Sequence, residues 1–258
     1  MENKQEKKNP NAALFVSLNE KQLKNVAAVF MLLNTFACAI LQNGILKYYN
    51  YTTEQLNERI AGLTGFSLDM LASILQIIGV IALPLIIYML VEGFKHTAND
   101  LRYLLSLFIL GIVSEIPYDL AFHHRFFFWD EQSPALALFI CGAFIMLCSR
   151  FLDNFPKVPR IVFVIIATLS AIAWCMVLRI SYGIIAVLLA SCYYNLYEHK
   201  VAKNILGALI TSLTLSGPLS LYLLYGYNGE RGNIRNKYVY YLFYPVQLML
   251  LAVISYLI

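Results

Sequence analysis

Glu92 and His96 lie four residues apart at the end of a long apolar stretch, which places them on one face if the stretch is helical. A carboxylate can hold an imidazole in one tautomer so that the ring acts as a general base, and acyl transfer needs such a base. His96 is therefore a candidate catalytic base, with Glu92 as its orienting group. A Glu/His contact at a membrane interface without a catalytic role is the alternative interpretation.

Glu115 and Asp119 form a second pair at the same spacing. Like charges four residues apart on a helix repel each other, so one carboxylate is expected to take up a proton or to have a cationic partner. The pair predicts either a polar ligand site or an ion-pair network that fixes the neighbouring loops. The candidate cations on the same side are Arg125, Arg179 and Arg231.

Residues of metal-binding type are present but are not grouped. Adjacent histidines such as His123 and His124 point in different directions on most backbones, so this pair alone does not favour a metal site. The five cysteines form no CxxC motif and fall in apolar stretches, which favours core positions over disulfides or zinc binding. They are Cys38, Cys141, Cys148, Cys175 and Cys192.

Two glycine-containing stretches interrupt the last third of the chain. Asn228-Gly229-Glu230-Arg231-Gly232 predicts a tight turn or a backbone that approaches a ligand, with Asn228 and Arg231 as its candidate binding residues. Gly217-Pro218, inside an apolar run, predicts a kink or break of the kind that often borders a cavity in membrane proteins.

The composition predicts the kind of structural element that positions these residues. Of 258 residues, 60% are hydrophobic and 13% charged, against about 25% charged in a soluble chain, so a water-soluble globule is excluded. At about 20 residues per crossing, the apolar runs predict an all-α, polytopic membrane protein with about eight transmembrane helices. The polar residues 1–24 form a separate N-terminal segment, and residues 25–258 form one transmembrane domain. The runs are 25–46, 67–91, 103–121, 134–149, 160–178, 182–197, 204–225 and 238–257.

The charge pattern predicts the orientation in the cell membrane. Alternate gaps between the runs hold twelve Lys and Arg residues on one side and seven on the other, which favours a cytoplasmic N-terminus and, with eight crossings, a cytoplasmic C-terminus. No small-residue cleavage signature follows the first run, so it is expected to stay as an anchor. The net charge of +4 comes from residues spread between apolar runs, and no nucleic-acid partner is expected.

Five sequence blocks together resemble the TraX family of polytopic membrane proteins, whose best known member is linked to N-acetylation of conjugative pilin. The resemblance implies a membrane acyltransferase, with acetyl-CoA as a possible donor and an exported peptide, pilin or glycan as a possible acceptor. No tightly bound cofactor is implied. The blocks are Glu92-Gly93-Phe94-Lys95-His96-Thr97, Ser114-Glu115-Ile116-Pro117-Tyr118-Asp119-Leu120, Ser181-Tyr182-Gly183-Ile184, Tyr227-Asn228-Gly229-Glu230-Arg231-Gly232 and Tyr241-Leu242-Phe243-Tyr244-Pro245-Val246-Gln247-Leu248.

The sequence departs from the family pattern where proton transfer would be expected. Asn34 and Thr35 stand where the family usually has an Asp-His pair, Val80 stands at an Arg position, and Gln247 replaces a His. Loss of a general base costs on the order of 10²–10⁴ in rate. We therefore expect a chain with weakened or lost catalysis, a pseudo-enzyme that keeps a polar cavity and acts as a binding or partner subunit.

Two other classes of function stay open. The first is an active acetyltransferase that uses His96 as base, Glu92 to orient it and the Arg231 loop for the acceptor, although the predicted topology puts His96 and Arg231 on opposite faces. The second is a small transporter, suggested by the kinked spans and the Glu115/Asp119 pair. Close helix contacts with another membrane protein are also compatible with the small residues in the spans.

Overall fold

The computed structural model describes residues 17–61, 67–152, 157–215, 217–230, 232 and 238–258. Over these ranges the protein is helical, with two isolated β-bridges and no strand. The all-α fold class is confirmed. The helices are α1 (Glu20–Phe36), η2 (Ala37–Ile45), η3 (Tyr48–Asn50), α2 (Thr53–Ala61), α3 (Leu68–Gly79), α4 (Ala82–His96), α5 (Asp100–His123), α6 (Pro134–Leu152), α7 (Lys157–Val177), α8 (Gly183–Asn195), α9 (Lys200–Thr211), η4 (Ser212–Thr214), α10 (Leu219–Tyr225) and α11 (Tyr238–Leu257).

The long apolar helices have the length that a bilayer requires. Among the described residues, four segments are long and apolar enough to cross a membrane, and four shorter apolar helices accompany them. This arrangement is that of a polytopic membrane protein. The long segments are Glu20–Ile45, Leu68–His96, Asp100–His123 and Val239–Leu257, and the shorter ones are Pro134–Arg150, Ile161–Val177, Gly183–Asn195 and Val201–Thr214.

Side-chain caps and one proline explain where several helices begin and break. Asn19 starts α1 through a reciprocal capping box with Gln22, in which each side chain accepts a hydrogen bond from the other's backbone amide. Within Leu68–His96, helix α3 ends at Gly79 and α4 begins at Ala82. Pro84 has no amide hydrogen to donate to the carbonyl four residues earlier, so the helix is interrupted just before it.

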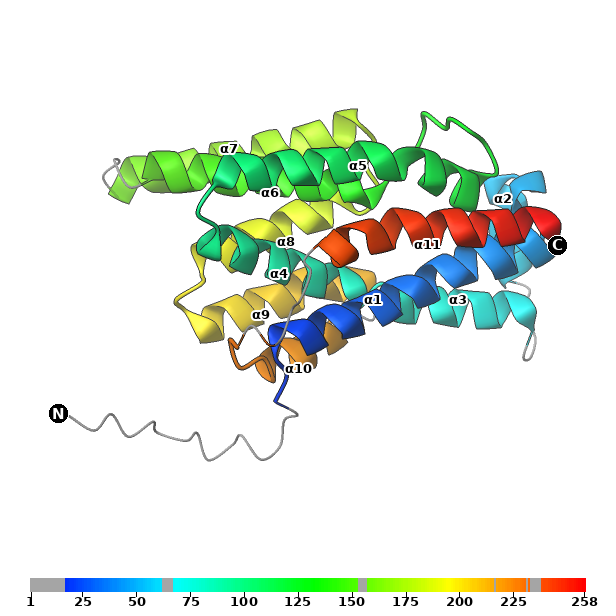
Figure 1. Ribbon diagram of the computed structural model, residues 1–258, viewed down its shortest axis with the longest axis horizontal. Coiled ribbons are helices and arrows are strands. Elements are labelled where there is room, and N and C mark those ends of the chain that lie inside the picture. Colours follow the sequence, from blue (N-terminus) through cyan, green and yellow to red (C-terminus); the bar gives the residue numbers. More distant parts are fainter. Residues whose placement is uncertain (1–16, 62–66, 153–156, 216, 231, 233–237) are drawn as a thin grey trace.

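The predicted run 204–225 does not cross the bundle, and this part of the eight-span prediction is wrong. It folds into a hairpin of α9 and α10, which lies along one half of the molecule (Figure 1). Lys203 in the first turns of α9 lies 5.0 Å from the centre of the Tyr88 ring, and the Tyr227 ring just after α10 lies 5.7 Å from that same ring. The hairpin therefore enters and leaves at the same end.

The hairpin turns at the predicted break. Leu215 has a positive φ of 38°, and Gly217 leaves no room for a side chain, since a Cβ there would lie 2.5 Å from the carbonyl oxygen of Thr211. Proline follows at once, and it favours the start of α10 because its fixed φ suits the beginning of a helix. Hydropathy alone had suggested a continuous span here.

Because the hairpin does not cross, α1 and α11 run parallel (Figure 1). Near their N-terminal ends the Tyr240 hydroxyl donates a hydrogen bond to Asn25 Oδ1 at 2.9 Å. Near the other end Gly44 packs against Ser255, whose Oγ would lie 3.3 Å from a Cβ at Gly44. Helix α1 therefore begins at one end of the bundle, and α11 finishes at the other end.

The core is one large cluster of apolar side chains, with a close contact between two helices at its edge. Buried side chains of α4, α6 and α8, such as Leu85, Phe144 and Leu189, form the centre of the cluster. At the edge, α1 and α3 approach so closely that a Cβ on Gly79 would lie 2.5 Å from Asn34 Cβ. Beyond this contact α1 continues as the π-helix η2, a rare form that is frequent at functional sites.

Candidate functional site

A cavity of about 1540 Å³ runs between α1, α4, α5, α6 and α11. Its lining includes residues at both ends of the bundle and residues in the middle. We call the two ends the Glu92 end and the His123 end. The Glu92 end is lined by Glu20, Lys24, Glu92, His96 and Gly229, and the His123 end by Tyr48, Tyr49, His123, His124, Arg125, Phe128 and Glu131.

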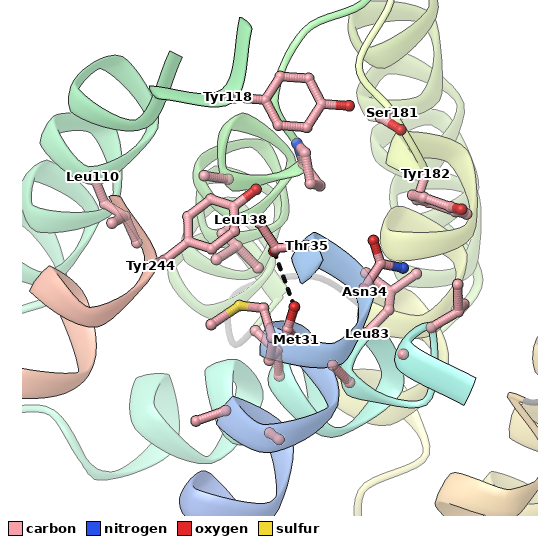
Figure 2. Close-up of a pocket in the computed structure, with 18 of the residues that line it drawn as sticks. Met31, Asn34, Thr35, Leu83, Leu110, Tyr118, Leu138, Ser181, Tyr182 and Tyr244 are labelled. Carbon is pink, nitrogen blue, oxygen red and sulfur yellow. Dashed lines mark hydrogen bonds between the residues drawn. The ribbon is translucent and has the colours of Figure 1, made fainter. Parts of the chain in front are cut away.

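The middle of the cavity contains three of the four residues for which the sequence analysis expects a departure from the family pattern. Asn34, Thr35 and Val80 line it, whereas Gln247 does not. Asn34 Nδ2 donates to the carbonyl oxygen of Gln76 at 3.3 Å, and Thr35 Oγ1 donates to that of Met31 at 3.0 Å (Figure 2). Gln247 is only 5% exposed, and its amide nitrogen and oxygen have no partner among the described residues.

Hydroxyl groups surround the same space. Tyr118, Ser181, Tyr182 and Tyr244 lie around Asn34 in the cavity (Figure 2). Tyrosine and serine hydroxyls are neutral near pH 7. Among the described residues, these four hydroxyl groups, Asn34 and Thr35 give the middle of the cavity polar but uncharged side chains.

At the Glu92 end, the predicted pair is in contact. His96 Nε2 lies 3.3 Å from Glu92 Oε2, and the His96 side chain is 76% exposed while that of Glu92 is 13% exposed. Glu92 also accepts hydrogen bonds from the hydroxyls of Tyr88 at 3.0 Å and of Tyr197 at 3.1 Å. Burial and the Glu92 carboxylate raise the pKa of Tyr197 to about 12. The tyrosines, which the sequence analysis missed, hold the carboxylate in place.

Two lysines pack on these tyrosines. Lys95 Nζ lies 3.6 Å from the centre of the Tyr197 ring, and Lys203 Nζ lies 5.3 Å from it. Such cation–π contacts are worth roughly 0.5–2 kcal/mol, depending on how far the cation is desolvated. They add positive charge around Glu92.

The predicted Asn228 loop lies at this same end. The backbone amide of Asn228 donates a hydrogen bond to the Leu18 carbonyl oxygen at 3.0 Å. The backbone amide of Glu20 donates one to the Glu230 carbonyl oxygen at 2.8 Å. Gly229 adopts a φ of 79° and lines the cavity. Arg231 lies outside the described residues. The described part of the Asn228 loop and His96 are therefore at the same end of the bundle.

At the His123 end, Glu115 and Asp119 bind the backbone instead of arginines. Glu115 accepts from the Ser133 amide at 3.0 Å, and Asp119 Oδ2 accepts from the Phe128 amide at 2.9 Å. Neither side chain lines the cavity. Two of the three predicted cations have other partners, because Arg179 pairs with Asp130 and Arg125 packs on the Phe128 ring. The two carboxylates thus fix the loop that follows α5.

A carboxylate in that loop lines the cavity instead. Glu131 Oε1 accepts from the Tyr118 hydroxyl at 3.0 Å, and Glu131 Oε2 lies 3.9 Å from His123 Nε2. The sequence analysis did not single out Glu131. An acidic residue close to two histidines in an aromatic loop was the signal that could have found it.

The cysteines are core residues. All five cysteines are free and buried, which confirms their predicted core positions. Within the described ranges, no three His, Cys, Asp or Glu side chains are grouped as a metal site would require.

The fold and cavity define a polytopic helical membrane protein with an internal polar chamber. The chain belongs to the TraX family, because the family model described as "TraX protein" matches residues 19–255. It is also 27% identical, over 90% of its length and 93% of the relative's, to the "Probable fimbrial assembly protein FimC, serogroup H1" of Dichelobacter nodosus. No solved structure matches the chain.

Proposed function

We propose that this protein binds an acyl donor, acetyl-CoA by family resemblance, in its cavity and serves as a binding or partner subunit in the modification or assembly of an exported fibre protein. Its own acetyl transfer is weakened or lost. The family membership supports the class of donor, and the fimbrial assembly name of the relative supports an exported fibre protein as partner.

One observation carries the proposal. Asn34, Thr35 and Val80 line a single cavity, and all three are neutral side chains. The family resemblance implies ionisable residues at these positions. An amide and a hydroxyl can still hydrogen-bond a ligand, but they cannot take up a proton near pH 7. At these three positions a ligand can be bound without proton transfer.

The charge pattern supports an orientation for this function. We assign every Lys and Arg to the sequence gap in which it falls. Because the hairpin enters and leaves at the Glu92 end, the last gap is counted with that end, and the gaps of that end hold fifteen of the nineteen Lys and Arg residues. The positive-inside rule assigns that end to the cytoplasm. A cytosolic donor would then enter at the Glu92 end, and an exported acceptor would approach the His123 end.

The proposal is tested by measuring the binding and transfer of labelled acetyl-CoA by the protein in lipid nanodiscs. We expect saturable binding with slow transfer to an acceptor peptide or glycan. The double substitution Asn34→Asp with Thr35→His should raise transfer without abolishing binding, because it restores an acid–base pair. The His199→Ala variant, exposed and outside the cavity, is the control. Absence of donor binding, or rapid transfer by the unmodified chain, would refute the proposal.

An active acetyltransferase based on His96 is the second candidate. The observation in its favour is that His96, Glu92 and Gly229 line the same end of the cavity. The His96→Ala substitution should then abolish rapid transfer. The transporter alternative has lost one of its two supports, because Glu115 and Asp119 bind backbone amides outside the cavity.

A further inference from the structure

The His123 end of the cavity contains the elements of a second acid–base site. His123, Glu131 and Tyr118 all line the cavity, and they come from the last turns of α5 and from the loop after it. Glu131 Oε1 accepts from the Tyr118 hydroxyl at 3.0 Å, which leaves Glu131 Oε2 facing His123 Nε2 at 3.9 Å. Catalytic contacts are often this long without a substrate.

The His123 ring packs between aromatic rings, and its Nε2 makes no hydrogen bond to the described residues. The His123 ring stacks on Phe128 with centroids 4.0 Å apart, and the Tyr118 ring meets it edge-on at 5.8 Å. Its side chain is 17% exposed, and its buried Nε2 has no hydrogen-bond partner among the described residues. A buried ring nitrogen without a partner costs free energy. Stability alone therefore does not explain its position beside a cavity.

The surrounding backbone is fixed well enough to position these groups. The Asp119 carboxylate accepts a hydrogen bond from the Phe128 backbone amide at 2.9 Å, and the Glu115 carboxylate accepts one from the Ser133 backbone amide at 3.0 Å. Glu131 lies between these two anchors in the sequence. The Glu115/Asp119 pair thus orders the loop that places Glu131 near His123. The spacing of the pair in the sequence did not predict this role.

We propose that His123 is the proton acceptor for the residual acyl transfer of this protein, with Glu131 and Tyr118 as its positioning residues. This proposal rests on the proposed donor-binding cavity and assigns its remaining chemistry to the His123 end. The acceptor is a hydroxyl or amine on the exported side, and the donor is an acyl thioester in the cavity.

The step balances without any further reactant. The acceptor oxygen or nitrogen forms a bond to the acyl carbonyl carbon while His123 takes up the proton of the acceptor. The carbon–sulfur bond then breaks, and His123 returns the proton to the departing sulfur. Glu131 stabilises the imidazolium that exists between the two proton transfers. Arg125, whose guanidinium lies 5.6 Å from the centre of the Phe128 ring, is a nearby cation that could stabilise the developing oxyanion.

Single-turnover transfer in nanodiscs, with labelled acetyl-CoA and an acceptor in excess, tests this assignment. His123→Ala should lower the transfer rate by on the order of 10²-fold, the lower range for loss of a general base. Donor binding, measured on the same preparations, should be unchanged. Glu131→Gln should also slow transfer and shift its pH profile, while Glu131→Asp should restore part of the rate. The matched control is His199→Ala, which lies outside the cavity.

The outcomes separate this inference from the proposed function. If the unmodified protein binds donor but transfers nothing, or if His123→Ala transfers at the original rate, the assignment of His123 is wrong while donor binding stands. A loss of transfer in His96→Ala but not in His123→Ala would move the chemistry to the Glu92 end. If no variant binds donor, the proposed function itself fails.

Discussion

His124 Nε2 lies 2.8 Å from Ser255 Oγ, which joins the end of α5 to the last turns of α11. The imidazole is stacked between Tyr49 and Tyr256, with ring centroids 4.5 and 4.2 Å away. His124 has a positive φ of 53°, an unusual conformation for a residue with a side chain. Three segments far apart in the sequence therefore meet on this one ring.

Stability should depend on pH through His124. Burial, and then the charge of Lys47, lower the pKa of His124 below its usual value, so the folded state favours the neutral ring. The unfolded state binds the proton more readily. The free energy of unfolding should therefore be fully retained above about pH 6.5 and fall as the pH drops below that value.

Thermal unfolding of the detergent-solubilised protein between pH 5 and 8 measures this effect. The fall at low pH should be smaller in His124→Gln, which keeps a hydrogen-bonding side chain but does not titrate. The exposed His199→Gln variant serves as the control and should keep the original pH dependence. Identical pH dependences for all three proteins would contradict the prediction.

The α9–α10 hairpin predicts on which side of the membrane α11 ends. Because α9 and α10 enter and leave at the Glu92 end, α11 finishes at the end opposite to the gap between α8 and α9. Alkaline phosphatase fused after Ile258 should be active on the exported side, whereas a fusion after Glu198 should be inactive. Green fluorescent protein at the same two positions should give the reverse pattern. Equal signals from both positions would restore the eight-span topology.

The sequence predicted the class of the fold well, and it predicted the middle of the cavity in part. Hydropathy located the apolar helices because a bilayer demands about 20 apolar residues per crossing. It could not separate a crossing from a hairpin at 204–225, since both expose apolar side chains. Family motifs led to Asn34 and Thr35, but spacing could not show whether Gln247 reaches the cavity.

The ionisable residues were harder to interpret from spacing. Glu92 and His96 are neighbours because one helix fixes their geometry. Glu115 and Asp119 accept hydrogen bonds from amides of a loop whose path depends on tertiary packing. Glu131 lies in that same loop, so its approach to His123 could not be predicted from the sequence.

Asp69 should stabilise the loop region at the His123 end. Its Oδ1 accepts from Arg59 Nε at 2.6 Å and from the Tyr48 hydroxyl at 2.9 Å, and Asp69 is 7% exposed. Removing a buried acceptor leaves its donors unsatisfied, at a cost of about 1–3 kcal/mol. Asp69→Ala should therefore lower the thermal midpoint clearly, while Glu58→Ala on the exposed face of α2 should not. Equal midpoints would show that the contact adds no net stability.

Gly79 should be the position where the smallest added side chain harms the cavity. A Cβ there would lie 2.5 Å from Asn34 Cβ and 2.7 Å from Asn34 backbone atoms, so α1 and α3 must separate to accept an alanine. Overpacking of this kind costs typically about 1–3 kcal/mol. Gly79→Ala should lower both the thermal midpoint and the affinity for labelled acetyl-CoA, because Asn34 lines the cavity. Gly207→Ala, where the closest atom is on the edge of the Tyr193 ring at 3.2 Å, should have a smaller effect on stability and leave donor affinity intact, since Gly207 does not line the cavity. If donor affinity fell equally in both variants, the contact between α1 and α3 would not be what shapes the binding space.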